Sequence, residues 1–98
     1  MIIVIAKSVI APEKQAAFIE AVKATGAVEA TATENGNISY DLVCSATEPG
    51  LMYMIERWTD GAALKVHSTG ANFLTIGKIC AEYGVKSEIK LFNADALN

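Results

Sequence analysis

The sequence predicts a single α+β domain over residues 1–98, of the ferredoxin-like type with the element order βαββαβ. Two observations support this fold class. Four β-rich segments and the helical patterns between them follow that order along the chain. Two of these segments are apolar on both faces, as central strands are, and two alternate, as edge strands do. We therefore expect a four-stranded antiparallel sheet with the first and third strands inside.

The first strand and the first helix account for the N-terminal third of the chain. Residues 2–10 are β-branched and apolar on both faces, which indicates a central strand. Pro12 then begins a helix, with Glu13 in its first turn, where the helix dipole favours a carboxylate. Apolar residues at helical spacing continue the pattern to about Glu34, and the Asn-Gly pair at 35–36 ends it. The pattern predicts one uninterrupted helix.

A β-hairpin is expected after this helix. In residues 38–45, apolar side chains alternate with Ser, Asp and Val, which is typical of a half-polar edge strand. Residues 47–50 read Thr-Glu-Pro-Gly and predict a turn. Residues 51–58 are largely apolar on both faces, which indicates the second central strand.

The C-terminal part predicts two helices and a last strand. Asp60 has the side chain of an N-cap for a short helix over residues 61–68. A further helix is expected from Ala71 to Tyr83, and Gly84 ends it. Residues 85–92 alternate between charged and apolar side chains, which predicts the second edge strand.

A homodimer follows from the apolar character of the central strands. The helices must lie on one sheet face, so that the other face would be open in a monomer. The central strands are apolar on that face as well, and 52% of the residues are hydrophobic. The core that so short a chain can bury is modest. We therefore expect two subunits to pack through their open sheet faces.

Composition disfavours several classes of protein. The net charge is −3, and no cluster of Lys or Arg provides the surface of a nucleic-acid binder. Cys44 and Cys80 do not form a disulfide framework and are expected to be free, buried thiols. The apolar start at residues 1–6 is too short to span a membrane. We therefore expect a cytoplasmic protein without nucleic-acid or membrane partners.

The candidate functional residues gather near the end of the third predicted strand. Glu56 and Trp58 share one strand face by period two, and His67, the only histidine, lies nine residues beyond Trp58. An imidazole can shuttle a proton near neutral pH. A carboxylate on an apolar face either has a raised pKa or needs a partner. Glu56 and His67 could thus be an acid/base pair, or could form structural contacts with the other subunit.

The Glu-x-Trp run at 56–58, followed by His67 and Phe73, resembles the signature of the antibiotic biosynthesis monooxygenase family, and of its quinol monooxygenase-like members most closely. Residues 36–40 also resemble the family's Gly-x-x-x-Tyr start of the second strand. The resemblance covers nearly the whole chain. It implies a dimeric α+β barrel, and oxidation of a small aromatic, such as a quinol or an anthrone, by molecular oxygen without a cofactor or metal.

On this interpretation, His67, Trp58 and Glu56 are the catalytic candidates, beside an apolar cavity. The candidates for substrate binding are Tyr40, Tyr53, Met52, Met54, Asn72 and Phe73. Each also has a structural alternative, in the core, at the rim or in the dimer interface. Neither a phosphate-cradling glycine loop nor a cluster of metal ligands is visible in the sequence.

Three other functions are alternatives to this interpretation. Haem-degrading relatives use an Asn in the first strand and a His four residues after the Phe, but here the first strand has no Asn and that position is Gly77, which argues against haem. An isomerase acting on a small hydroxy-carbonyl compound would need the same acid/base pair, although the sparse basic residues disfavour it. A non-enzymatic module that binds a small molecule would need only the cavity.

Overall fold

The computed structural model describes all 98 residues and confirms the predicted ferredoxin-like α+β fold. Its four strands are β1 (Ile2–Val9), β2 (Asn37–Cys44), β3 (Leu51–Trp58) and β4 (Lys86–Asn93). They form one antiparallel sheet in the order β2-β3-β1-β4. The two strands that are apolar on both faces, β1 and β3, therefore lie in the centre, as predicted.

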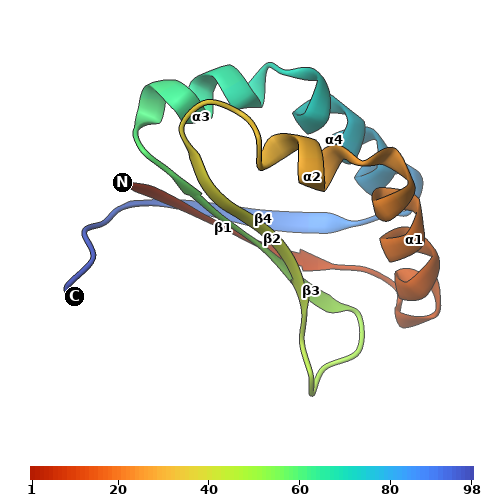
Figure 1. Cartoon of the computed structure of the whole chain (residues 1–98). Coiled ribbons are helices and arrows are strands. Elements are labelled where there is room, and N and C mark those ends of the chain that lie inside the picture. Colours follow the sequence, from red (N-terminus) through yellow and green to blue (C-terminus); the bar gives the residue numbers. More distant parts are fainter.

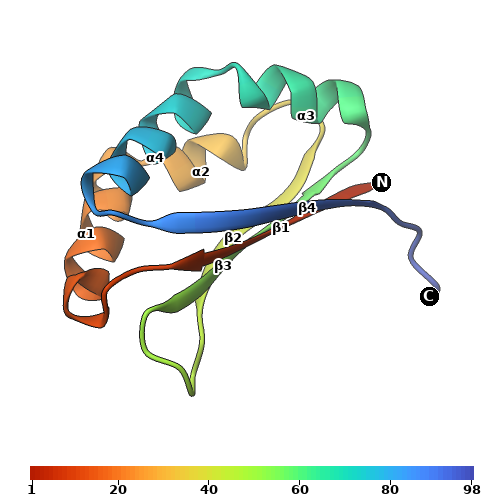
Figure 2. The same ribbon diagram turned by 180° about the vertical axis from the view of Figure 1, so that it is seen from behind.

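The helices all cover the same face of the sheet (Figures 1 and 2). They are the 3-10 helix η1 (Pro12–Lys14), α1 (Gln15–Thr25), α2 (Ala27–Thr31), α3 (Gly61–Ser68) and α4 (Ala71–Glu82). The opposite face carries no element of this chain (Figure 1). No helix has both the length and the apolar character needed to cross a membrane.

The prediction of one uninterrupted helix over residues 12–34 is wrong. The segment begins as η1, and the α-helix that follows is broken at Gly26, whose φ of 68° is left-handed. The Thr25 hydroxyl donates to the carbonyl of Val22 (2.6 Å) and accepts from the amide of Ala27 (3.1 Å), which links the end of α1 to the start of α2. Because glycine tolerates this backbone conformation, the chain turns here without strain.

The register of the strands arranges the helix-facing side chains in rows across the sheet, and the three rows that follow the row of Ile2 and Trp58 form the floor of the site. The first row is Leu91, Val4, Glu56 and Tyr40; the second is Ile89, Ala6, Met54 and Leu42; the third is Ser87, Ser8, Met52 and Cys44. Successive rows are two residues apart, which is about 7 Å along the strands. A bulge at Ile38 interrupts the pairing of β2 with β3, so the regular alternation of β2 begins only at Ser39.

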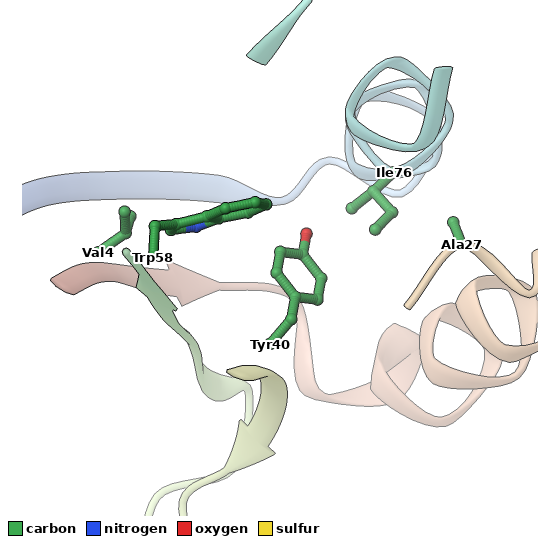
Figure 3. Packing of buried hydrophobic residues seen from close by; sticks show 5 residues of the cluster. All are labelled: Val4, Ala27, Tyr40, Trp58 and Ile76. Atoms are coloured by element: carbon green, nitrogen blue, oxygen red, sulfur yellow. The ribbon is translucent and has the colours of Figure 1, made fainter. Parts of the chain in front are cut away.

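The hydrophobic core consists of two clusters. The first core cluster is Val4, Ala27, Tyr40, Trp58 and Ile76. The second core cluster is Ile10, Phe18, Val22, Met52 and Ile79. Figure 3 shows the rings of Tyr40 and Trp58 between the sheet and Ile76 of α4. The first core cluster lies near the first row, and the second core cluster lies near the third row. Each cluster joins the sheet to the helices.

The open face of the sheet presents apolar side chains of both central strands. Ile3 and Ile5 of β1, and Tyr53 and Ile55 of β3, alternate with the buried residues of their strands and are half-buried in the single chain. Phe92, on the edge strand β4, is 46% exposed. This face has the apolar character that the sequence predicted for it.

Candidate active site

His67 lies at the centre of a buried group of side chains beneath α3. The helix begins at the N-cap Asp60, as predicted, and carries His67 in its last turn. The side chain of His67 is 2% exposed. Three rings surround it, those of Trp58, Tyr40 and Phe73, with centroid distances of 4.8, 5.6 and 5.6 Å. The imidazole is therefore fixed in position within the subunit.

Glu34, in the turn after α2, is the hydrogen-bond partner of His67. Its two carboxylate oxygens lie 3.0 and 3.1 Å from Nδ1 of His67. Oε2 also accepts a hydrogen bond of 3.0 Å from the side-chain amide of Asn72. A carboxylate accepts hydrogen bonds, so the hydrogen on Nδ1 of His67 is donated to Glu34. Nε2, on the other side of the ring, is turned toward Glu56.

Glu56 connects this group of side chains to the space between α4 and the sheet. Its Oε1 accepts a hydrogen bond of 3.0 Å from Nε1 of Trp58 and lies 4.0 Å from Nε2 of His67. Oε2 has no hydrogen-bond partner in the chain. Burial raises the pKa of the Glu56 carboxyl; the hydrogen bond from Trp58 and the charge of His67 oppose this shift, and Glu34 adds to it. We call Glu34, Glu56 and His67 the acid–imidazole cluster.

The hydroxyl of Tyr40 makes no hydrogen bond within the chain, although the residue is only 8% exposed. Every fully enclosed side-chain nitrogen and oxygen has a partner, so this hydroxyl must be reached by solvent. Burial raises the pKa of Tyr40, and the nearby Glu56 raises it further. Tyr40 therefore retains its proton at neutral pH and can donate a hydrogen bond to a ligand.

A cavity of about 210 Å³ lies between α4 and the sheet, and 11 of its 15 lining residues are hydrophobic. Its floor follows the three rows, with Glu56 and Tyr40 at one end, Ser8 and Ser87 at the other, and the apolar second row between them. Its roof includes Phe18, Phe73, Ile76, Gly77 and Cys80. Exposed Ile89 and Ser87 on the edge strand β4 mark its mouth.

A second hollow lies on the far side of Tyr40, between the helices α1 and α2 and the strand β2. It is about 250 Å³ and includes Lys23, Glu29 and Asp41 in its lining. Tyr40 and Leu42 line both spaces and form the wall between them. Neither Glu56 nor His67 lines this hollow. Glu56 lines the cavity under α4, whereas Glu34 lines a separate surface hollow between the turn after α2 and the start of α3.

The structure brings together most of the residues predicted for the site. Those that line the cavity are Glu56, Tyr40, Met52, Met54 and Phe73. His67 and Trp58 do not line it; they lie behind Glu56 and contact its carboxylate. Asn72 bonds to Glu34 and also lies behind the cavity. Within the chain, Oε1 of Glu56 and Nδ1 of His67 have hydrogen-bond partners. A contact of either residue with a second subunit stays a prediction.

Tyr53 and the two cysteines differ from expectation. Tyr53 lies on the open face of β3, between Lys7 and Val43, and does not reach the cavity. Strand alternation separates it from Met52 and Met54, because neighbouring residues face opposite sides. Cys44 is exposed on the edge strand β2, which corrects the prediction of a buried thiol, whereas Cys80 is half-buried and burial raises its pKa.

Two features of the site were missed from the sequence. Glu34 was taken only as the end of a helix, although a buried histidine requires a hydrogen-bond partner and Glu34 directly precedes the Asn-Gly turn. Ser8 was treated as part of an apolar strand, and its pairing with Ser87 depends on the register of β1 and β4. No group of three His, Cys, Asp or Glu side chains lies close enough to hold a metal ion.

The fold and the site together define a class of protein: a ferredoxin-like α+β domain with an acid–imidazole cluster at one end of a mostly apolar cavity. The family described as "Antibiotic biosynthesis monooxygenase" matches residues 1–78. The chain belongs to the antibiotic biosynthesis monooxygenase family, which confirms the resemblance seen in the Glu-x-Trp and His motif.

Similar proteins come from distant organisms. The Bacillus subtilis (strain 168) protein "Putative monooxygenase YcnE" is 36% identical over 73 residues, which cover 74% of this chain and 75% of that protein. A conserved protein from Methanosarcina mazei Go1 has a TM-score of 0.84 at 28% identity, covering 96% of this chain and 92% of that one. A Deinococcus radiodurans structure described as an antibiotic biosynthesis monooxygenase has a TM-score of 0.87, covering 100% and 97%; its 20% identity supports the fold alone.

Proposed function

We propose that this protein is a cofactor-independent monooxygenase that uses molecular oxygen to oxidise an electron-rich aromatic compound, such as a quinol or an anthrone. The observation that carries the proposal is the end of the apolar cavity at which Glu56 and Tyr40 lie. There, Oε2 of Glu56 and the hydroxyl of Tyr40 both lack partners in the chain. A phenolic substrate that enters the cavity would supply both missing hydrogen bonds. Membership of the family supports a monooxygenase.

Glu56 acts as the base in this proposal. Its raised pKa makes its carboxylate a stronger base than an exposed one, which favours removal of a phenolic proton. The indole of Trp58 holds Oε1 and thereby leaves Oε2 for the substrate. His67 lies behind the base, with Nε2 4.0 Å from Oε1 and Nδ1 bonded to Glu34, and so fixes the side of the carboxylate away from the substrate. Trp58 and His67 are therefore positioning residues, and Glu56 is the catalytic residue.

Tyr40 donates a hydrogen bond to the substrate oxygen as negative charge develops on it. Because its pKa is raised, Tyr40 stays protonated beside the anion. The electron-rich anion then reacts with molecular oxygen at a ring carbon. The substrate loses two hydrogen atoms and gains one oxygen atom, and the second oxygen atom leaves as water. The apolar second row excludes solvent from the reacting ring.

Oxygen uptake tests this function. The wild type should consume oxygen with at least one member of a panel of quinols and anthrones, measured in the presence of a chelator. Glu56→Gln keeps an acceptor for the Trp58 indole but removes the base, so turnover should fall about 10²- to 10⁴-fold. Glu82→Gln, on the exposed side of α4, is the matched control and should leave turnover unchanged.

The alternatives predict other results. Tight binding without oxygen uptake would indicate a binding module. Conversion of a hydroxy-carbonyl compound without oxygen uptake would indicate an isomerase. A rate with Glu56→Gln equal to that of the wild type would contradict the role of Glu56 as the base, whatever the substrate.

We also propose that two chains associate through their open sheet faces. The half-buried Ile3, Ile5 and Ile55 have no cover within the chain, and association would bury them. Light scattering at micromolar concentration should give twice the 10.4 kDa of one chain. Ile5→Lys should shift the protein toward a monomer, whereas Val66→Lys, on the exposed side of α3, should not. A monomeric wild type would contradict the proposal. The cytoplasmic location stays a prediction.

A further inference from the structure

The end of the cavity that lies away from Glu56 is also polar. The hydroxyls of Ser8 on β1 and Ser87 on β4 lie 2.8 Å apart, and both residues line the cavity. The two residues face each other in the strand register, so the backbone fixes their separation. Ser8 is 8% exposed, and Ser87 lies at the mouth. A hydroxyl pair thus stands at the far end of an otherwise apolar floor.

The hydroxyl pair retains hydrogen-bonding capacity. Each hydroxyl has one hydrogen and two lone pairs, and one hydrogen is used between Ser8 and Ser87. The only other partner of these hydroxyls is the carbonyl of Ala6, which lies 3.5 Å from the Ser8 oxygen, at the limit for a hydrogen bond. The pair can therefore both donate to and accept from an oxygen of a ligand.

The distance between the two polar ends limits the ligand that can use both. Glu56 and Tyr40 are in the first row, and Ser8 and Ser87 are in the third, so that their backbone positions are about 13 Å apart along the strands. The Glu56 side chain is longer than that of Ser8, and an aromatic ring with oxygens at opposite positions, with a hydrogen bond of about 2.8 Å at each end, is of the same order as this spacing. An oxygen over the apolar second row would have no partner.

The volume of the cavity limits the number of rings. An apolar cavity of about 150 Å³ holds one benzene molecule. At about 210 Å³, this cavity fits one ring or two fused rings and is small for a three-ring anthrone. The spacing of the two polar ends and the volume of the cavity therefore both favour a compact aromatic compound with two oxygens.

We propose that the Ser8–Ser87 hydroxyl pair is a second polar subsite, which binds the substrate oxygen para to the hydroxyl held by Glu56 and Tyr40. The substrate class is then a one- or two-ring 1,4-quinol. The inference rests on the proposed function, because that function assigns the first oxygen to Glu56 and Tyr40. The serine pair determines which aromatics are preferred and does not take part in the reaction.

Calorimetric titration under argon tests the subsite without turnover. Naphthalene-1,4-diol should bind the wild type about fivefold more tightly than 1-naphthol, which lacks the second oxygen. Ser8→Ala and Ser87→Ala should each remove most of this preference and leave the affinity for 1-naphthol unchanged. Ser68→Ala, on the exposed surface of α3, is the control and should keep the preference.

The result also separates this inference from the proposed function. Equal affinity for the two ligands in the wild type, a preference that survives both serine variants, or no binding of either ligand would overturn the subsite. A serine-dependent preference in a protein that never consumes oxygen would support the subsite and contradict the monooxygenase. Since Ser87 is exposed, Ser87→Ala should fold normally even if Ser8→Ala does not.

Discussion

The two core clusters occupy the two ends of one sheet but differ in what surrounds them. The first core cluster packs around the acid–imidazole cluster, with Trp58 and Tyr40 contacting the buried His67. The second core cluster contains no ionisable side chain, and its partly buried hydrophobic neighbours include Ile19, Leu42 and Tyr83. A buried polar group costs free energy unless it is paired, so polar groups are a poor way to stabilise a core of this size. We infer that Ile10, Val22 and Ile79 of the second cluster, which do not line the cavity, stabilise the fold, and that the first cluster serves chemistry.

The pairing of the polar groups beside the first core cluster bears on this inference. Glu34 accepts hydrogen bonds from both His67 and Asn72, so Nδ1 of His67 and the Asn72 amide have a partner inside the subunit. Among the groups without a hydrogen bond, Oε2 of Glu56 and the Tyr40 hydroxyl belong to residues that line the cavity, and Nε2 of His67 lies behind Glu56. A purely structural network would be expected to satisfy its members internally. Two of the unmet hydrogen bonds belong to residues that line the cavity, as the proposed function requires.

The largest expected effect is on stability, from Ile10→Ala in the second core cluster. Ile10 is 6% exposed and does not line the cavity. Its truncation should lower the free energy of unfolding by about 2–5 kcal/mol, through lost burial and a residual cavity. Turnover of the folded fraction at low temperature should be unchanged. Urea denaturation and oxygen uptake on the same preparation check both, and a parallel loss of turnover would mean that the two clusters are not separate in function.

His67→Ala, in the acid–imidazole cluster beside the first core cluster, should show the opposite balance. Turnover should fall about 10- to 100-fold, because Glu56 loses the imidazole that lies behind its carboxylate and a hydrogen bond to a charged group is lost. The free energy of unfolding should fall by only about 1–3 kcal/mol, since Glu34 is part-exposed and can be solvated. If the loss of turnover were no larger than the loss of folded protein, His67 would be a structural residue.

Trp58→Phe should act mainly on the pH dependence. The indole N–H lowers the pKa of Glu56, so its removal should raise that pKa further. A base works when deprotonated, and the rise of kcat/KM with pH should therefore move to higher pH in the variant. A pH–rate profile measures the shift, and Tyr83→Phe, in a part-exposed position beside the second core cluster, should show none. An unmoved profile would exclude Glu56 as the titrating group.

The fold was predictable from residues whose chemical type depends on their local position in a strand or at a helix end. The strand order followed from β1 and β3 being apolar on both faces, and the cap of α3 followed from Asp60. The break at Gly26 was not predictable in the same way, because the apolar spacing continues across it and a single glycine within a helical pattern is tolerated. Local pattern thus predicts the elements better than their interruptions.

The site was predictable only where its members are close in sequence. Glu56 and Trp58 are two residues apart on one strand, so period two alone placed them together. Glu34 lies 33 residues from His67, and Ser87 lies 79 residues from Ser8. The first pair depends on the position of the turn after α2 against α3, and the second depends on the register of β1 with β4. A single sequence shows neither.

The smallest expected effect is the pH dependence of stability contributed by Glu56. Its pKa is raised in the folded state, so the folded protein binds its proton more tightly than the unfolded chain does. This contribution is fully present below the unfolded pKa, about 4.3, and is lost as pH rises through the higher folded pKa. In Glu56→Gln it is absent, so the stability of the wild type minus that of the variant should fall as pH rises through this window, by at most about 1.4 kcal/mol per pH unit. Urea denaturation of both proteins from acid to neutral pH gives this difference, in which the titrations that the two proteins share largely cancel. A difference that rises with pH would mean that attraction to His67 exceeds burial and that Glu56 is the anion of a structural ion pair, which would remove the contrast between the two core clusters.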